Sequence, residues 1–225
     1  MVSQIQNLKE IFGELFAKLM AFSLEEEFGE SLGDSLVAFY NLQEGEEYEF
    51  NPPEEFLFLS WFLLDDTDSE NLSLIDEFMK RNSDRLSLQE MQICRALKET
   101  HLTLMEVMNV KPGESLALRD VFLREEFETP ESIGSDSVVK GSLLYSRVLP
   151  LGDSRFLVGA GIFLDASILE PLTQFVTEQY AMECEEGEMM TFRDFLKGNG
   201  ELINWWIRAI EQGKPLESGT PDDKN

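Results

Sequence analysis

Apolar side chains recur at helical spacing at the start of the chain. They occupy the i, i+3, i+4 and i+7 positions of one helix face and are Ile5, Leu8, Ile11, Phe12, Leu15, Phe16 and Leu19. This pattern predicts a helix with one buried face. Ser23 and Glu26 form a capping-box motif, which predicts that a second helix begins at Ser23. Apolar residues four positions apart follow, so we expect the two helices to pair as a hairpin.

The Asn51-Pro52-Pro53 segment is expected to interrupt the helical pattern, because a residue before proline avoids the helical conformation. We therefore predict a boundary here, with a second region after it. The run Phe56–Leu64 is apolar on every side and is predicted to be a central, enclosed helix, with a buried strand as the alternative. Leu72–Met79 has amphipathic spacing, and Ser87 with Glu90 forms another capping box. Helices are therefore expected over residues 54–100.

Between residues 102 and 164 the pattern changes to short apolar runs separated by turn residues. Lys111-Pro112-Gly113 and Leu151-Gly152-Asp153 are typical of tight turns. Because the connections are short, we predict antiparallel strands near residues 102–109, 115–122, 126–129, 142–149 and 155–163. Gly159 and Gly161 in the last strand predict a bend or a close backbone approach, as in a small barrel.

Helical spacing returns after Asp165 and Thr191, which are predicted N-caps, and Gly213 and Pro215 stop the last helix. The predicted fold class is therefore α+β, mainly helical, with a small central antiparallel sheet or partly open barrel of about five strands. The predicted organisation is an acidic helical hairpin at 1–50, an α+β core at 51–214 (helices 54–100, sheet 102–164, helices 165–213) and a flexible tail at 215–225.

The charge balance narrows the range of partners. The chain of 225 residues has 44 Asp plus Glu against 18 Lys plus Arg, which gives a net charge of −26. Nucleic acids and anionic membranes are bound through Lys and Arg, so direct binding to either is disfavoured. Over residues 1–77 Lys9 and Lys18 are the only cations, so negative charge is concentrated in this N-terminal part of the chain, which we call the acidic front. Such a surface either keeps the protein soluble or attracts a basic partner.

Other features of the sequence bear on the cellular compartment. Cys94 and Cys184 have neither metal-site nor redox spacing, so two free thiols are expected, with a single disulfide as the alternative. The N-terminus lacks the basic start of a signal peptide. The longest apolar run, Phe56–Leu64, is shorter than the roughly 20 residues that span a bilayer. These features predict a cytoplasmic protein that does not enter a membrane.

No side-chain pattern predicts a catalytic residue, a metal or a cofactor. His101 is the only histidine, and its place between a helix and a strand is typical of packing or of a helix C-terminus. Carboxylate pairs cannot be singled out among so many acids. One acidic loop has calcium-like spacing but lacks the central Gly and terminal Glu of an EF-hand loop, and its acids are Asp65, Asp66, Asp68 and Glu70.

Short segments occur in a recognisable order between residues 25 and 210. They are Phe58-Leu59-Ser60-Trp61-Phe62-Leu63-Leu64-Asp65, Leu104-Met105-Glu106-Val107, Gly113-Glu114-Ser115-Leu116-Ala117-Leu118-Arg119-Asp120 and Lys140-Gly141-Ser142-Leu143-Leu144-Tyr145-Ser146-Arg147-Val148-Leu149-Pro150. In this order the chain resembles a loose family of uncharacterised bacterial proteins that often end in a small zinc-binding SEC-C module. Residues 215–225 contain no Cys or His, so we do not expect this module here. The resemblance implies the order of the fold elements and no activity.

These observations predict a non-enzymatic interaction or regulatory protein that binds a basic or larger protein partner. The predicted contact residues are Glu25, Glu26, Glu27, Glu44, Glu46, Glu47, Glu49, Trp205 and Trp206. Adjacent residues point about 100° apart on a helix, so one tryptophan is expected to face a partner, with burial between two elements as the alternative. The functional alternatives are an inhibitor that mimics nucleic acid and a carboxylate-based enzyme or cation-dependent binder. The oligomeric state does not follow from the sequence.

Overall fold

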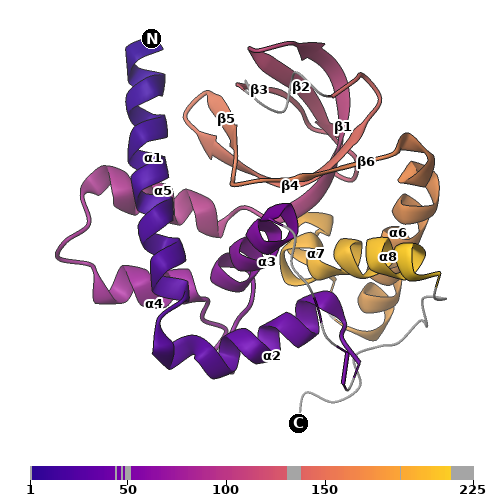
Figure 1. Cartoon of the computed structure of the whole chain (residues 1–225), viewed down its shortest axis with the longest axis horizontal. Helices are drawn as coiled ribbons and strands as arrows, with labels where there is room; N and C mark the ends of the chain where they lie inside the picture. The colour runs from indigo at the N-terminus through magenta and orange to yellow at the C-terminus, as the bar shows by residue number, and fades with distance from the viewer. Residues whose placement is uncertain are drawn as a thin grey trace.

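The fold consists of a nearly closed antiparallel sheet and a set of helices that cover one of its faces (Figure 1). The computed structural model describes residues 2–43, 45–46, 48, 52–130, 138–187 and 189–213. Within these residues the predicted fold class, α+β with a partly open barrel, is confirmed. The tail predicted at residues 215–225 lies outside the described residues.

The first two helices diverge instead of forming the predicted hairpin (Figure 1). The Ser23 hydroxyl donates to the carbonyl of Met20 (2.9 Å), so Ser23 ends the first helix and does not cap the second. The apolar face of the first helix packs on the three helices that follow the second, so it is not available to its neighbour. In chain order these elements are α1 (Val2–Ser23), η1 (Glu26–Phe28), α2 (Gly29–Tyr40), α3 (Pro52–Leu64), α4 (Leu74–Arg81) and α5 (Leu88–Lys98).

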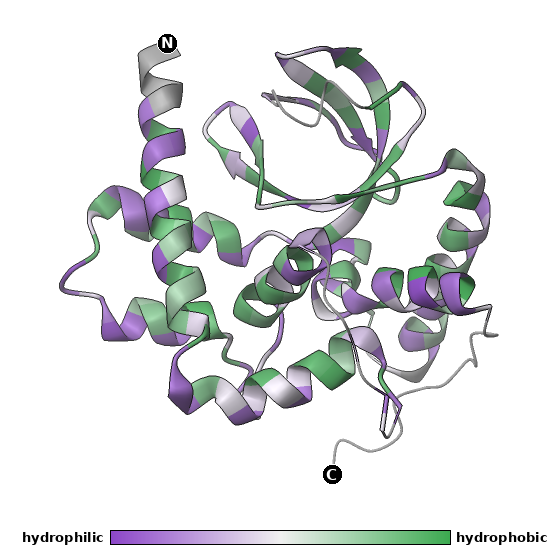
Figure 2. Cartoon of the chain, viewed as in Figure 1, coloured by the Kyte–Doolittle hydropathy of each residue, from purple (hydrophilic) through white to green (hydrophobic). Residues whose placement is uncertain are grey.

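Helix α3 is the central helix that the sequence predicts. Its residues 57–64 are all buried, and Figure 2 shows an apolar colour along most of its length. The predicted capping box at Ser87 and the predicted N-cap at Thr191 both form, with each side-chain oxygen accepting from a backbone amide at 3.2 Å. The remaining helices follow the sheet and are η3 (Ala166–Ile168), α6 (Leu169–Glu186), α7 (Phe192–Gly198) and α8 (Glu201–Gln212).

The strands pair antiparallel in the order β3-β2-β1-β4-β5, and β6 also pairs with β4. The last predicted strand is split at Gly159, where φ is 70°. The Thr129 hydroxyl donates to the Arg155 carbonyl (3.0 Å), and this contact nearly closes a five-stranded barrel between β3 and β5. The strands are β1 (Leu102–Lys111), β2 (Ser115–Asp120), β3 (Glu126–Pro130), β4 (Leu143–Leu151), β5 (Ser154–Leu157) and β6 (Ile162–Leu164).

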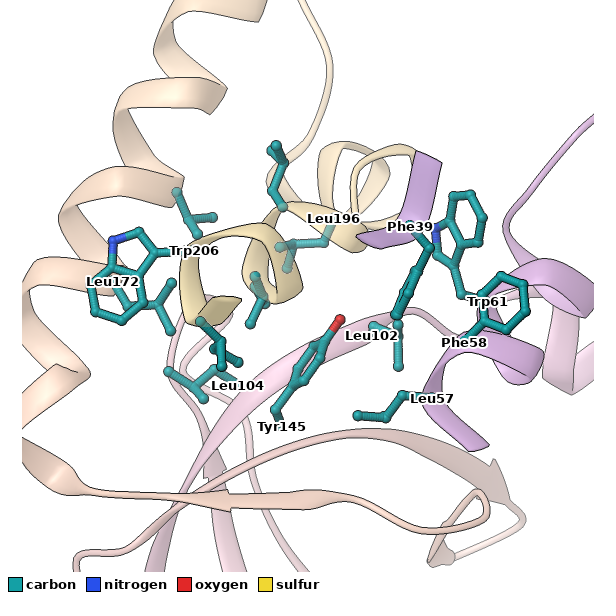
Figure 3. Close-up of a cluster of buried hydrophobic side chains, with 14 of the residues drawn as sticks. Phe39, Leu57, Phe58, Trp61, Leu102, Leu104, Tyr145, Leu172, Leu196 and Trp206 are labelled. Carbon is teal, nitrogen blue, oxygen red and sulfur yellow. The ribbon is translucent and has the colours of Figure 1, made fainter. Parts of the chain in front are cut away.

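The two faces of the sheet have different neighbours, because successive side chains of a strand alternate between them. Leu104 and Tyr145 point toward the helices and join Trp206 in one core (Figure 3). The Tyr145 hydroxyl donates to the carbonyl of Gly200 (2.9 Å), just before α8. The opposite face lines the barrel interior, where the strands contribute Met105, Val107, Leu116, Leu118 and Leu144.

The predicted boundary at residue 50 does not separate two cores. Phe39 of α2 packs against Phe58 and Trp61 of α3, with ring centroids 5.6 and 5.3 Å apart. Asn204 of α8 donates to the carbonyl of Phe39 (2.8 Å). The apolar faces on both sides of the Pro-containing connection therefore share one core.

None of the helices in the described part of the chain is both long enough and apolar enough to cross a membrane.

A buried ion network joins the helices to β4. The fully buried guanidinium of Arg147 forms a bidentate pair with Asp65 at the end of α3 (Nη1–Oδ1 3.1 Å) and donates to the Thr100 hydroxyl (3.0 Å). Lys197 of α7 also donates to Asp65 and to the carbonyls of Leu64 (2.8 Å) and Thr100 (2.9 Å). Burial lowers the pKa of Lys197, and Asp65 opposes that shift. Two cations therefore share one carboxylate.

We expect the Asp65→Asn substitution to lower the free energy of unfolding by about 3–5 kcal/mol, because it leaves the fully buried Arg147 without a counter-charge and also removes the partner of Lys197, whose side chain is 30% exposed. Lys18→Met is the control, since it breaks a pair with Glu90 (2.9 Å) in which the Lys18 side chain is 56% exposed. Such a surface pair contributes about 0–1 kcal/mol. Urea unfolding measures both variants, and an equal loss in the two would contradict the structural role of Asp65.

Candidate functional site

A cavity of about 300 Å³ lies at one end of the barrel, and we call it the barrel-mouth cavity. Its walls come from the end of α5, from strands β1 to β5 and from α7, so segments far apart in the sequence meet there. The lining residues are Glu99, Thr100, His101, Thr103, Asp120, Leu123, Glu125, Phe127, Val148, Pro150, Arg155 and Arg193.

Strand alternation explains why this cavity is polar. Thr103 continues the inward-facing row that contains Met105 and Val107, and Asp120 continues the row of Leu116 and Leu118. The same alternation puts Arg155 of β5 on the cavity wall. The barrel interior is thus filled by apolar side chains at one end and lined by polar ones at the other.

Asp120 anchors the connection between β2 and β3 at the cavity. One carboxylate oxygen accepts from the backbone amides of Phe122 (2.8 Å) and Leu123 (2.7 Å), and the other accepts from the Thr103 hydroxyl (2.9 Å). Burial raises the pKa of Asp120, and these hydrogen bonds oppose the shift. With three donors already bound, Asp120 positions the wall of the cavity more than it offers a free charge.

His101 is a buried neutral imidazole on the cavity wall. Its side chain is 7% exposed, and neither ring nitrogen has a hydrogen-bond partner within the described residues. Burial, followed by the nearby cations Arg147 and Arg193, lowers the pKa of His101 to about 4. A buried polar group without a partner costs about 1–3 kcal/mol, so the site contains hydrogen-bonding capacity that the fold does not use.

The two guanidinium groups of the cavity differ in their partners. Arg193 of α7 pairs with Glu125 (2.7 Å), and their side chains are 46% and 57% exposed, so this pair lies at the rim. Arg155 is partly buried, and among the described residues its guanidinium donates a hydrogen bond only to the carbonyl of Ser154 (3.4 Å) and forms no ion pair. The cavity can therefore hold a ligand by charge and by hydrogen bonds.

Several predicted contact residues are engaged within the fold. Glu25, Glu26 and Glu27 are exposed at the turn between α1 and α2, and Glu27 pairs with Arg81 of α4. Glu46 accepts from Arg208 of α8 (3.3 Å), which ties the connection after α2 to the last helix. Residues outside the described part of the chain include the predicted contacts Glu44, Glu47 and Glu49.

Of the two tryptophans of which one was predicted to face a partner, Trp206 is 6% exposed and lies in the core (Figure 3), so it follows the alternative of burial between two elements. Trp205 is partly buried, and its indole N–H donates to the carbonyl of Ala38 (2.8 Å). The two tryptophans point in different directions, as their adjacent positions predict, but both hold α8 in place instead of forming a surface patch.

The loop with calcium-like spacing has other roles. Asp65 belongs to the ion network. Asp68 accepts from the backbone amides of Glu70 (2.8 Å) and Leu72 (3.0 Å), so it closes a turn. Within the described residues no group of three or more His, Cys, Asp and Glu side chains is arranged to hold a metal ion.

Sequence patterns assigned His101 to packing or to a helix C-terminus and did not identify Thr103, Asp120, Arg155 and Arg193 as site residues. One signal was available, because a carboxylate at the end of the Leu116, Leu118, Asp120 alternation faces inward. Nothing in the sequence, however, shows that Arg193, far along the chain, lies beside the start of β1.

Comparison with known proteins gives a family but no activity. A family model described as a family of unknown function (DUF7986) matches residues 2–197, which confirms the expectation of an uncharacterised family. No curated protein and no solved structure matches the chain. The matched region includes every residue of the cavity and of the ion network.

The shifted pKa of His101 predicts how stability depends on pH. The folded pKa of about 4 lies below the ordinary value of 6.5, so the unfolded chain binds more protons at residue 101 between these values. His101 therefore reduces stability as pH falls from 6.5 to 4. Relative to His101→Gln, we expect the wild-type protein to lose about 2 kcal/mol of unfolding free energy between pH 7.5 and pH 5.

The comparison with His101→Gln isolates this effect. Burial raises the pKa of Glu201 to about 7, which acts in the opposite direction, but it does so in both proteins. Urea unfolding at the two pH values measures the difference, and NMR of the single histidine reports its titration directly. A ring that titrates near pH 6.5 would contradict the buried neutral state.

Proposed function

We propose that this chain, which belongs to the family of unknown function DUF7986, binds a small polar ligand in the barrel-mouth cavity. The observation that carries the proposal is the buried His101, which lines a cavity and has no hydrogen-bond partner among the described residues. Unused hydrogen-bonding groups in a cavity are what a bound ligand satisfies. The volume, about 300 Å³, is at the lower end of the range for small-molecule sites, which favours a ligand of metabolite size.

The proposed role is binding without catalysis. General-base catalysis needs a base that is oriented by one partner and bonded to a nucleophile or water. The His101 ring has no such partner within the described residues, and Asp120 is occupied by Thr103 and two backbone amides. A carboxylate-based enzyme or cation-dependent binder, considered from the sequence, has no comparable support from these contacts.

To test this, small polar compounds are screened by NMR of the His101 ring, whose signals are unique in the chain. We expect hits that shift the ring signals of the wild-type protein and lose affinity in Val148→Phe, which fills the cavity. Val139→Phe is the control, because Val139 is 68% exposed and does not line the cavity. Leu123→Trp at the cavity wall is a second blocking variant if Val148→Phe unfolds. Hits that bind all variants equally would contradict the proposed site.

A second candidate function is docking of a basic protein on the acidic front. The observation that favours it is the exposed turn between α1 and α2, where Glu25 and Glu26 stand beside Leu24, which is 56% exposed. Such a surface would attract a cationic partner or mimic nucleic acid on it. We also propose, from the sequence, that the protein is cytoplasmic and bacterial and that it is related to proteins with SEC-C modules.

Retention on immobilised polylysine tests this second function. We expect Glu25→Lys with Glu26→Lys to elute at lower salt than the wild-type protein, because the front would be the contact surface. Glu183→Lys with Glu185→Lys changes the net charge equally at exposed positions of α6 and is the control. Equal effects of the two double variants would show that net charge alone governs retention.

A further inference from the structure

Arg155 differs from the other shielded arginines of the described chain. Three arginines that are partly or fully buried have carboxylate partners: Arg119 pairs with Glu106, Arg147 with Asp65 and Arg208 with Glu46. Arg155 is also partly buried, yet it forms no ion pair within the described residues. Because buried charges are normally paired, the guanidinium of Arg155 has unused capacity to pair with an anion from outside the fold.

The other charges of the cavity do not satisfy Arg155. Asp120 already accepts three hydrogen bonds, and Glu125 pairs with Arg193. Glu99 is exposed to solvent at the end of α5. The rim pair between Arg193 and Glu125 is well exposed and is thus worth about 0–1 kcal/mol, so an incoming anion can compete with Glu125 for Arg193.

The surroundings of His101 favour an anion as well. Arg147, Arg193 and Lys197 all act to lower its pKa, against one opposing carboxylate, Asp65. Cations therefore outnumber carboxylates among the charged groups that act on His101, although the lining of the cavity also includes Glu99, Asp120 and Glu125. The neutral ring can in addition donate one hydrogen bond and accept another.

We infer that the barrel-mouth cavity binds the anionic oxyacid group of a small molecule, a carboxylate or a phosphate, against the guanidinium of Arg155, with Arg193 as a second contact at the rim. This inference rests on the proposed ligand-binding function and specifies its ligand class. Guanidinium groups suit both anions because their parallel N–H donors match two oxygens at once.

The test uses inorganic phosphate and acetate as probes, titrated separately into the full chain at about 150 mM salt, where charges beyond ~8 Å are largely screened. Calorimetry and NMR of the His101 ring and the Arg155 Nε–H group follow binding. We expect saturable binding that weakens about tenfold or more in Arg155→Gln, the loss expected for a charge-assisted contact. Binding of one probe alone identifies the oxyacid as phosphate or as carboxylate.

Arg85→Gln is the matched control, because Arg85 is exposed, has no ion pair among the described residues and lies outside the cavity. Arg155→Lys keeps the charge but not the planar fork, and we expect intermediate affinity; it replaces Arg155→Gln if that variant unfolds. Equal weakening in Arg85→Gln, or unchanged binding in Arg155→Gln, would overturn the inference. If neither probe binds but a neutral compound from the cavity screen does, the anion class fails and the binding function stands; if nothing binds, both fail.

Discussion

The bidentate pair between Arg147 and Asp65 is the buried charge contact that joins the helices to the barrel. Arg147 belongs to the row of β4 that faces the helices, and its apolar neighbours in that row would tolerate several docking positions. A buried guanidinium requires a partner in one place, because an unpaired charge in the interior is strongly unfavourable. Asp65 supplies it from the end of α3, and Thr100 and Lys197 add the ends of α5 and α7. One network thus fixes three helices relative to one strand.

The same network sets the character of the cavity beside it. Thr100 accepts from Arg147 and is followed directly by His101, so the pair that docks the helices also places the imidazole on the cavity wall. Burial is the main reason that the pKa of His101 is low and its ring neutral, and the cations Arg147 and Lys197, which share the carboxylate of Asp65, lower that pKa further. The ion network that joins the helices to β4 therefore also contributes to the polar character of the cavity.

The negative net charge of the chain and the cationic groups of its cavity are compatible, because they lie in different parts of the molecule. Its net charge of −26 suggests contacts with cationic partners, yet the barrel-mouth cavity contains an imidazole without a hydrogen-bond partner and a guanidinium without a carboxylate among the described residues. Both hold together because the acids are mostly on the surface while Arg147, Lys197 and Arg155 point inward. The surface of this molecule can thus attract cationic partners at long range, while the cavity can bind an anionic group at short range.

The sequence by itself determined the local features, because each depends on neighbours within a few residues: α3 as a buried helix, the caps at Ser87 and Thr191, and the strands up to the break at Gly159. Only the tertiary structure decided that α1 packs on α3 to α5 and not on α2, and that Trp206 is buried. It also decided that Arg193 lines one cavity with His101 and Arg155. The physical reason is that apolar periodicity states which face is buried but not against what, whereas a polar cavity depends on side chains brought together by the closure of the barrel.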